Sequence, residues 1–441
     1  MKPTLNALPT KRQVQWQTLE FYGFIHFGMN TFTNSEWGEG VESPSLFNPT
    51  ELDCRQWVKS MKAAGMKGAI LTCKHHDGFC LWPSAVTEYS VKNSPYQEGQ
   101  GDVVKEFAEA CQEEGLKFGI YLSPWDRHET CYGKGEAYND FFIQQLEELL
   151  TGYGEIFEVW FDGANGESEG KKQDYDWERY YELIRRHQPE AVIAVCGPDV
   201  RWVGNEAGQA RKNEWSVVPE ALMDIEKIAA HSQQVDDGLF AKRLSSSDED
   251  LGSRKALENY QGRLVWYPAE VNTSIRPGWF YHEEENHQVK SAKALFGMYL
   301  KAVGGNSTFL LNLAPSPKGK IKTVDVKTLV ELGELIEQLN HPVETKRQVQ
   351  KNGDIYLESS QEVPFNCLLL GEAIEKGQQV EAFRVSIEEN NEWVNVYEGE
   401  SIGYKRLLLL PLLTTKKVKI ELIEYRELPE IDKVDIFLLE R

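Results

Sequence analysis

Over its first 340 residues the chain alternates short apolar segments with amphipathic ones. Six apolar segments have the length and composition of buried strands: 21–28, 67–73, 116–124, 155–163, 191–198 and 262–270. The segments between them have helical periodicity. In the stretch DVVKEFAEACQEEG, for example, Val104, Phe107 and Cys111 share one face, and Gly115 marks the end of the helix. Strands and helices in this order predict a parallel α/β architecture.

Two parallel α/β architectures fit this pattern, a closed barrel and a doubly wound open sheet. The segments 65–71 and 115–121 both join a helix-ending glycine to a strand, as one βα step of either fold requires. Residues that could take part in catalysis or binding follow at least five strands, whereas an open sheet concentrates such residues at one switch point. We therefore expect a TIM-like (β/α) barrel.

The pattern changes near Pro342. From about residue 345 the chain consists of short alternating strands separated by polar turns, which predicts an antiparallel β-sandwich of about 100 residues. We expect a catalytic barrel domain over 1–342 and a sandwich domain over 343–441. The sandwich could bind sugar or could pack on the barrel as a support.

Composition excludes two classes of partner. No apolar run approaches the roughly 18 residues of a membrane span. The formal net charge of −21 is unsuited to nucleic acid, because proteins bind nucleic acid by neutralising phosphates with Lys and Arg. A neutral substrate is expected instead.

The cysteines bear on the cellular compartment. Their number, seven, is odd and their spacing suggests no pairing, which favours reduced thiols and a cytoplasmic setting. The segment 1–16 has no apolar stretch typical of a signal peptide. A periplasmic or secreted protein whose signal had been removed would have the same sequence pattern.

A carboxylate stands at the end of the fourth predicted strand, in the segment EVWFDGANG. The apolar residues Val159, Trp160 and Phe161 lead into Asp162 and Gly163, which brings a rigidly held carboxylate to the mouth of the barrel. Glycoside hydrolysis uses two carboxyl groups, one as nucleophile and one as general acid/base. Asp162 is the predicted nucleophile.

Two residues compete for the role of acid/base. Glu206 lies on a glycine-flanked loop after the fifth strand, where a nearby Trp can raise the pKa of a carboxyl group. Glu270 ends the sixth predicted strand and is expected to stay ionised beside Arg276 and to bind hydroxyls. Glu206 is favoured, although either could be a surface or capping carboxylate.

Residues at and after the end of the second strand allow a metal site. Zinc could be bound by Cys73, His75, His76 and Cys80, or a harder ion by His75, His76 and Asp77. Adjacent histidines point to opposite sides of an extended backbone, and no CxxC or HExxH spacing occurs. Neutral imidazoles that bind sugar hydroxyls account for the same residues, so neither a metal nor an organic cofactor is expected.

Six motifs occur in order between residues 21 and 319: HFGMNTF, EWG, KHHDGFCLW, GIYLSPW, VWFDG and GGNSTFLLNLAPSPKG. Together they resemble the α-L-fucosidases of glycoside hydrolase family 29. The resemblance implies that Asp162 is the nucleophile. It also implies a fucose pocket built from His26, Glu36, Trp37, His75, His76, Tyr121 and Trp160.

Two later segments resemble the branch of that family specific for α-1,3 and α-1,4 linkages. In the segment RWVGNEAG the resemblance assigns the acid/base role to Glu206. In WYPAEVNTSIRPGWFYH it places Glu270, Arg276 and Trp279 at the site.

The predicted function is that of a retaining exo-α-L-fucosidase. It would remove terminal α-1,3/1,4-linked fucose from Lewis-type oligosaccharides or glycoconjugates by double displacement. Three alternatives remain: another exo-glycosidase on the same barrel, such as one acting on α-L-galactosides, a non-catalytic fucose-binding protein, and a metallohydrolase.

Overall fold

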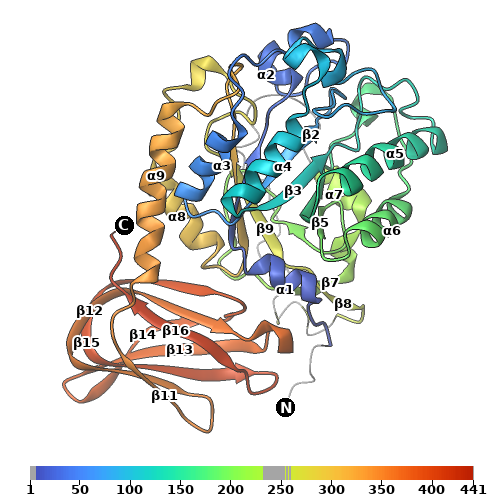
Figure 1. The fold of residues 1–441 in the computed structure, drawn as a ribbon. Helices are drawn as coiled ribbons and strands as arrows, with labels where there is room; N and C mark the ends of the chain where they lie inside the picture. The colour runs from blue at the N-terminus through green and yellow to red at the C-terminus, as the bar shows by residue number, and fades with distance from the viewer. Residues whose placement is uncertain (1–5, 232–253, 255–256, 258–259, 441) are drawn as a thin grey trace.

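The computed structural model describes residues 6–231, 254, 257 and 260–440. A barrel surrounded by helices forms the larger part, and an antiparallel β-domain formed by the C-terminal part of the chain packs beside it (Figure 1). The predicted (β/α) barrel and C-terminal β-sandwich are therefore confirmed. No helix of the described part of the chain is long and apolar enough to cross a membrane.

The barrel sheet contains eight parallel strands in the order β5-β4-β3-β2-β1-β10-β9-β6. Their bounds are β1 (Phe21–Ile25), β2 (Gly68–Lys74), β3 (Lys117–Leu122), β4 (Ile156–Phe161), β5 (Val192–Val195), β6 (Arg201–Trp202), β9 (Ala269–Ser274) and β10 (Thr308–Leu313). A parallel bridge between Ala194 and Val200 brings the two edge strands together and nearly closes the barrel.

Amphipathic helices cover the outside of the sheet. These are α3 (Cys54–Ala63), α4 (Val103–Glu114), α5 (Glu136–Gly152), α6 (Trp177–His187), α8 (Ala292–Ala302) and α9 (Thr323–Glu337). Shorter helices are α1 (Lys11–Gln17), α2 (Met29–Thr33) and α7 (Ile225–His231). In α4, Asp102 accepts a hydrogen bond from the Lys105 N–H, a cap worth about 1 kcal/mol. As the sequence predicts, the helix ends at Gly115, which adopts the left-handed conformation.

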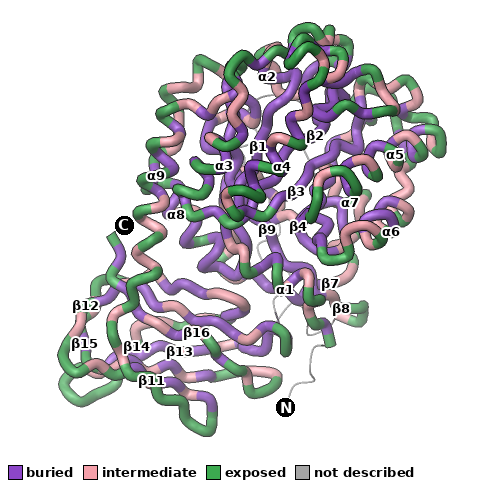
Figure 2. The backbone as a smooth tube through the Cα atoms, viewed as in Figure 1, coloured by how far each residue is buried: buried purple, intermediate pink, exposed green. Residues whose placement is uncertain are grey.

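Every second residue of a strand faces the barrel axis. On β4 this periodicity places Glu158, Trp160 and Asp162 on one face, with Asp162 just beyond the carboxyl end of the strand. The backbone of the barrel strands is buried throughout this region (Figure 2). The nucleophile predicted from sequence therefore directly follows a buried strand that pairs with β3 and β5.

The sixth predicted strand, 262–270, is interrupted in the structure. Its first part forms β8 (Leu264–Trp266), which pairs antiparallel with β7 (Val217–Pro219), and the barrel strand β9 begins only at Ala269. Pro268 lies between them and has no N–H to donate to a sheet. As a consequence Glu270 is the second residue of a strand and not its last.

The C-terminal domain contains β11 (Lys346–Val349), β12 (Ile355–Glu372), β13 (Val380–Glu389), β14 (Glu392–Gly399), β15 (Arg406–Tyr425) and β16 (Ile431–Phe437). The long strands β12 and β15 pair along both of their halves, with register shifts between them. One half of β12 also pairs with β11 and the other with β16, so the two strands contribute to both layers around one apolar core. The predicted change of pattern near residue 342 lies between α9 and β11.

This domain is attached at the amino-terminal ends of the barrel strands. Gly305, just before β10, forms a bridge with Arg406. Lys405 forms an ion pair with Glu20, just before β1, at 2.8 Å. These contacts and Asp162 lie at opposite ends of the strands. Barrel enzymes place their active sites at the carboxyl ends, where Asp162 lies.

Candidate active site

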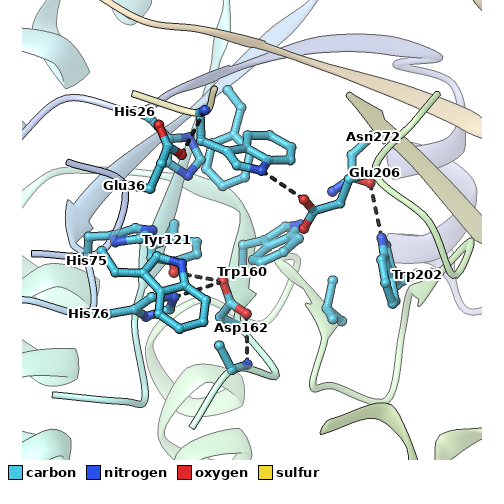
Figure 3. A pocket seen from close by; sticks show the side chains of 15 residues that line it. His26, Glu36, His75, His76, Tyr121, Trp160, Asp162, Trp202, Glu206 and Asn272 are labelled. Carbon is cyan, nitrogen blue, oxygen red and sulfur yellow. Dashed lines mark hydrogen bonds and ion pairs between the residues drawn. The ribbon is translucent and has the colours of Figure 1, made fainter. Parts of the chain in front are cut away.

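A pocket of about 600 Å³ opens at the carboxyl ends of the barrel strands (Figure 3). All but two of the predicted site residues line it: His26, Glu36, Trp37, His75, His76, Tyr121, Trp160, Asp162, Glu206 and Trp279. The remaining lining residues are Phe24, Ala164, Val195, Trp202 and Asn272.

Asp162 is held by two hydrogen bonds. Its Oδ1 accepts from the Ala164 N–H at 2.9 Å, and its Oδ2 accepts from the Tyr121 hydroxyl at 2.9 Å. The Nε2 atom of His76 lies 3.9 Å from the same Oδ2. About a quarter of the Asp162 side chain remains exposed, so the oriented carboxylate is accessible from the pocket.

Glu206 occupies a loop between two glycines. Gly204 and Gly208 have φ angles of 99° and 72°, in the left-handed region that favours glycine. The indole Nε1 of Trp279 donates to Glu206 Oε2 at 2.8 Å. Burial of the carboxyl group raises the pKa of Glu206 well above its ordinary value, and the charge of Asp162 raises it further. A protonated carboxyl group at neutral pH can serve as a general acid.

Two histidines present acceptor nitrogens to the pocket. His26 Nδ1 lies 2.7 Å from the side-chain oxygen Oδ1 of Asn312. Because an amide oxygen can only accept a hydrogen bond, Nδ1 carries the proton. His76 Nδ1 lies 2.7 Å from Ser123 Oγ, whose own hydroxyl donates to the backbone. Burial lowers the pKa of His26 to about 3 and that of His76 to about 4. Both rings are therefore neutral at neutral pH, with Nε2 as an acceptor.

His75 has the opposite tautomer. Its Nδ1 accepts from the Asn30 amide at 3.4 Å, which leaves the proton on Nε2. Burial holds the pKa of His75 well below its ordinary value, and the neighbouring His76 adds to this effect. The pocket thus offers one imidazole donor and two imidazole acceptors, a set suited to the hydroxyls of a neutral sugar.

Aromatic rings form the floor and walls. Trp160 stacks on Tyr121 with ring centroids 5.5 Å apart, and Trp279 packs against His26 at 5.1 Å. The Trp37 ring meets the edge of His76 at 5.6 Å. Such surfaces suit the apolar faces of a pyranose ring.

Glu36 forms hydrogen bonds to the loop that contains Trp279, which is distant in the sequence. Its carboxylate accepts from the backbone N–H groups of Trp279 and Phe280, at 2.9 and 3.2 Å. His282 Nε2 lies 2.6 Å from Glu36 Oε1. The hydrogen bond to Glu36 raises the pKa of His282 above its ordinary value. His282 was not predicted, although it belongs to the quoted segment GWFYH.

Other pocket residues were also missed by the sequence analysis. Phe24 could have been recognised, because it alternates with Tyr22 and His26 on the first strand. Trp202, whose indole donates to Asn272 at 3.0 Å, lies on a strand of two residues that has no readable periodicity.

The structure does not bring Glu270 and Arg276 into the pocket. Glu270 is fully buried below Trp160, whose Nε1 donates to it at 2.9 Å. Arg276 was expected to lie beside Glu270, but its guanidinium binds Asp325 at 2.8 Å. Glu270 lies outside the pocket because it is near the amino-terminal end of β9, whereas the pocket opens at the carboxyl ends of the strands.

The residues of the alternative zinc set are separated in the structure. Cys73 packs in the apolar layer between sheet and helices, whereas His75 and His76 face the pocket. Among the described residues no three His, Cys, Asp or Glu side chains are grouped to hold a metal ion.

Comparison with known proteins identifies the family. A sequence model of the alpha-L-fucosidase family matches residues 4–340. The chain belongs to this family. Alpha-L-fucosidase 1 of Arabidopsis thaliana is 39% identical over 98% of the chain and 87% of its own length.

Solved structures of fucosidases extend the likeness to both domains. A glycoside hydrolase 29 family member from an unknown rumen bacterium is 39% identical, with a TM-score of 0.84 over 100% of this chain and 78% of its own. A Ruminococcus gnavus GH29 fucosidase, solved in complex with fucose, is 29% identical, with a TM-score of 0.84 over 100% and 97%. The chain is an alpha-L-fucosidase, a glycoside hydrolase whose substrates are fucosylated glycans.

Proposed function

We propose that this fucosidase releases terminal α-1,3- and α-1,4-linked L-fucose with retention of configuration, with Asp162 as nucleophile and Glu206 as acid/base. The observation that carries the proposal is the contrast between the two carboxyl groups of the pocket. Asp162 is accessible and accepts two hydrogen bonds, whereas burial and the charge of Asp162 raise the pKa of Glu206 and favour its protonated form. A retaining glycosidase needs this pair of states at the start of its cycle.

In the first step Asp162 attacks the anomeric carbon while Glu206 gives its proton to the glycosidic oxygen. The carbon–oxygen bond to the leaving group breaks, and a fucosyl ester of Asp162 forms. In the second step Glu206, now a carboxylate, takes a proton from water as the water attacks the same carbon. Fucose leaves, and both carboxyl groups return to their initial states.

The pocket chemistry supports a neutral terminal sugar. The three imidazoles can bind hydroxyls without a charge, and Trp160 closes the floor of the pocket. A closed floor admits the end of a glycan and not the middle of a chain, which supports exo action.

Exchange of Asp162 for Ala tests the nucleophile. Turnover of an aryl fucoside should fall by about 1000-fold or more. Azide, which can fill the space left by the carboxylate, should restore part of it and give fucosyl azide of inverted configuration. Asp140→Ala, on the exposed surface of α5, is the control and should keep full activity. An unimpaired Asp162→Ala enzyme would contradict the assignment.

A substrate panel tests linkage and sugar. The glycine-flanked loop around Glu206 resembles that of the branch specific for α-1,3 and α-1,4 linkages, so Lewis-type trisaccharides should release fucose faster than a 2′-fucosylated oligosaccharide. Equal rates would contradict this linkage preference. An aryl α-L-galactoside in the same panel tests the alternative sugar, which differs from fucose at the C6 methyl group.

A further inference from the structure

Two carboxyl groups that the mechanism does not use lie inside the barrel. Glu158 on β4 and Glu270 on β9 are both 0% exposed. Within the described residues neither forms an ion pair with a Lys, Arg or His, and the largest influence on the pKa of each is burial. A buried acid without a cation needs another form of compensation.

Hydrogen-bond donors supply that compensation unequally. Glu158 Oε2 accepts from the Trp16 indole at 2.9 Å. Glu270 Oε1 accepts from the Trp160 indole at 2.9 Å, and Glu270 Oε2 accepts from the Tyr22 hydroxyl at 2.5 Å. Glu158 Oε1 is buried and receives no donor from the part of the chain that the structure describes.

The two carboxyl groups are close enough to share a hydrogen bond. Two adjacent carboxylates in a low-dielectric interior cannot both be ionised, so the pair keeps one proton at neutral pH. The donor pattern places it on Glu158 Oε1, because Glu270 already receives two donors and Glu158 Oε1 has none. Burial raises the pKa of both carboxyl groups. The charge of Glu270 raises the pKa of Glu158 further, whereas hydrogen bonds to Trp160 and Tyr22 act to lower that of Glu270.

Trp160 connects this pair to the pocket. Its Nε1 binds Glu270, while its ring stacks on Tyr121, whose hydroxyl binds Asp162. On β4 the residues Glu158, Trp160 and Asp162 share one face, so the pair lies one layer of side chains below the nucleophile. The Trp160 indole therefore contacts the Glu270 carboxyl group and also lines the pocket.

We propose that Glu158 and Glu270 form a one-proton carboxyl pair that fixes Trp160 at the pocket floor and holds a negative charge beneath the sugar while positive charge develops on it. Both are positioning residues, since neither reaches the pocket. The proposal rests on the retaining mechanism above, whose transition state resembles an oxocarbenium ion. Across an apolar ring a fixed negative charge is weakly screened and stabilises such a cation more than the neutral ground state.

Glu270→Gln removes the charge at nearly constant size. For an aryl fucoside, kcat should fall by about tenfold or more, with KM changed by less than about threefold. Glu158→Gln keeps the hydrogen bond between the two side chains, because the amide N–H can donate to Glu270 in place of the carboxyl O–H. Its kcat should fall by at most about threefold. Both variants replace a glutamate with a glutamine, and they differ only in whether the negative charge of the pair remains.

Glu372→Gln in the sandwich is a matched control for loss of a buried carboxyl group. Glu372 accepts from the backbone N–H groups of Gln379, Val380 and Gly403 at 2.7, 3.1 and 2.7 Å, at no point near the pocket. Its exchange should lower Tm and leave kcat unchanged. If kcat falls in Glu270→Gln but not in Glu372→Gln, general destabilisation does not explain the fall.

The proton itself can be detected by infrared spectroscopy. At neutral pH the difference spectrum of wild type minus Glu158→Gln should contain the carbonyl band of a protonated carboxylic acid. A missing band, a wild-type kcat for Glu270→Gln, or equal losses in both glutamine variants would overturn the proposal. Covalent labelling of Asp162 in the wild type separates the two hypotheses: without it the retaining mechanism fails, and with it these results concern the carboxyl pair alone.

Discussion

The pocket has a strand half and a loop half, and they are held in different ways. The strand half comprises the residues that end or directly follow β1 to β4: His26, His75, His76, Tyr121, Trp160 and Asp162. The loop half comprises Glu36, Glu206 and Trp279, with His282 behind them. Sheet hydrogen bonds fix the backbone of the first group, whereas side-chain contacts between distant segments fix the second.

The titratable groups of the two halves also differ. On the strand half, burial lowers the pKa of the histidines, so these rings are neutral. On the loop half, burial raises the pKa of Glu206, and a hydrogen bond to Glu36 raises that of His282. In the proposed mechanism, the group that gains and loses a proton, Glu206, therefore lies on the loop, and the nucleophile Asp162 lies at the end of a strand.

The largest expected effects separate the two carboxyl groups. Asp162→Asn should lower kcat by about 1000-fold or more for every substrate, since no nucleophile remains. Glu206→Gln should lower it by about 100-fold or more for a Lewis-type trisaccharide, but by less than about tenfold for an aryl fucoside whose leaving group needs no proton in the first step. Steady-state rates on both substrates measure this contrast. Equal losses for Glu206→Gln on both substrates would contradict the acid role.

Loss of one hydrogen bond on each half should change the pH profile in different ways. The wild-type rate should fall at high pH, as Glu206 loses its proton on passing its raised pKa. Trp279→Phe removes a donor that lowers this pKa, so the basic limb should move to higher pH. Tyr121→Phe removes a hydrogen-bond donor from Asp162 on the strand half, so kcat/KM should fall while the basic limb stays in place. Measurements of kcat/KM against pH for the two variants test this. Movement of the basic limb in both variants would remove the distinction between the halves.

The smallest effect concerns stability. His76 has a folded pKa of about 4 against an ordinary 6.5, so its contribution is present above pH 6.5 and is lost as pH falls toward 4. His282 has a raised folded pKa, so its contribution is fully present below pH 6.5 and is lost as pH rises from 6.5 through the raised folded pKa. Consequently, His76→Asn should flatten the loss of Tm in acid, and His282→Gln should lower Tm more at about pH 6 than at about pH 9. Calorimetry over this pH range measures how the Tm of each variant depends on pH. A Tm difference from wild type that changes with pH in the same direction for both variants would contradict the account.

The strand half is readable from sequence because its information is local. A period of two and a polar residue at the strand end suffice to place His26 and Asp162. The same rule would have revealed Glu158, a charged residue in step with Trp160 and Asp162 in an otherwise apolar strand.

The loop half depends on contacts that no local pattern encodes. Glu36 and His282 are 246 residues apart, and Arg276 and Asp325 are 49 apart. Glu270 was misplaced because a single proline moves the start of β9. For Glu206 the sequence supplied a position through a family resemblance, while the burial that raises its pKa follows from the fold.

Covalent trapping of the enzyme tests the central claim most directly. A fluorinated fucosyl fluoride, which forms the glycosyl-enzyme ester quickly and hydrolyses slowly, would be incubated with the wild type, and the labelled peptide sequenced by mass spectrometry. The mechanism predicts one fucosyl unit per chain, attached to Asp162. A label on another residue, or full turnover with no trapped ester, would contradict it.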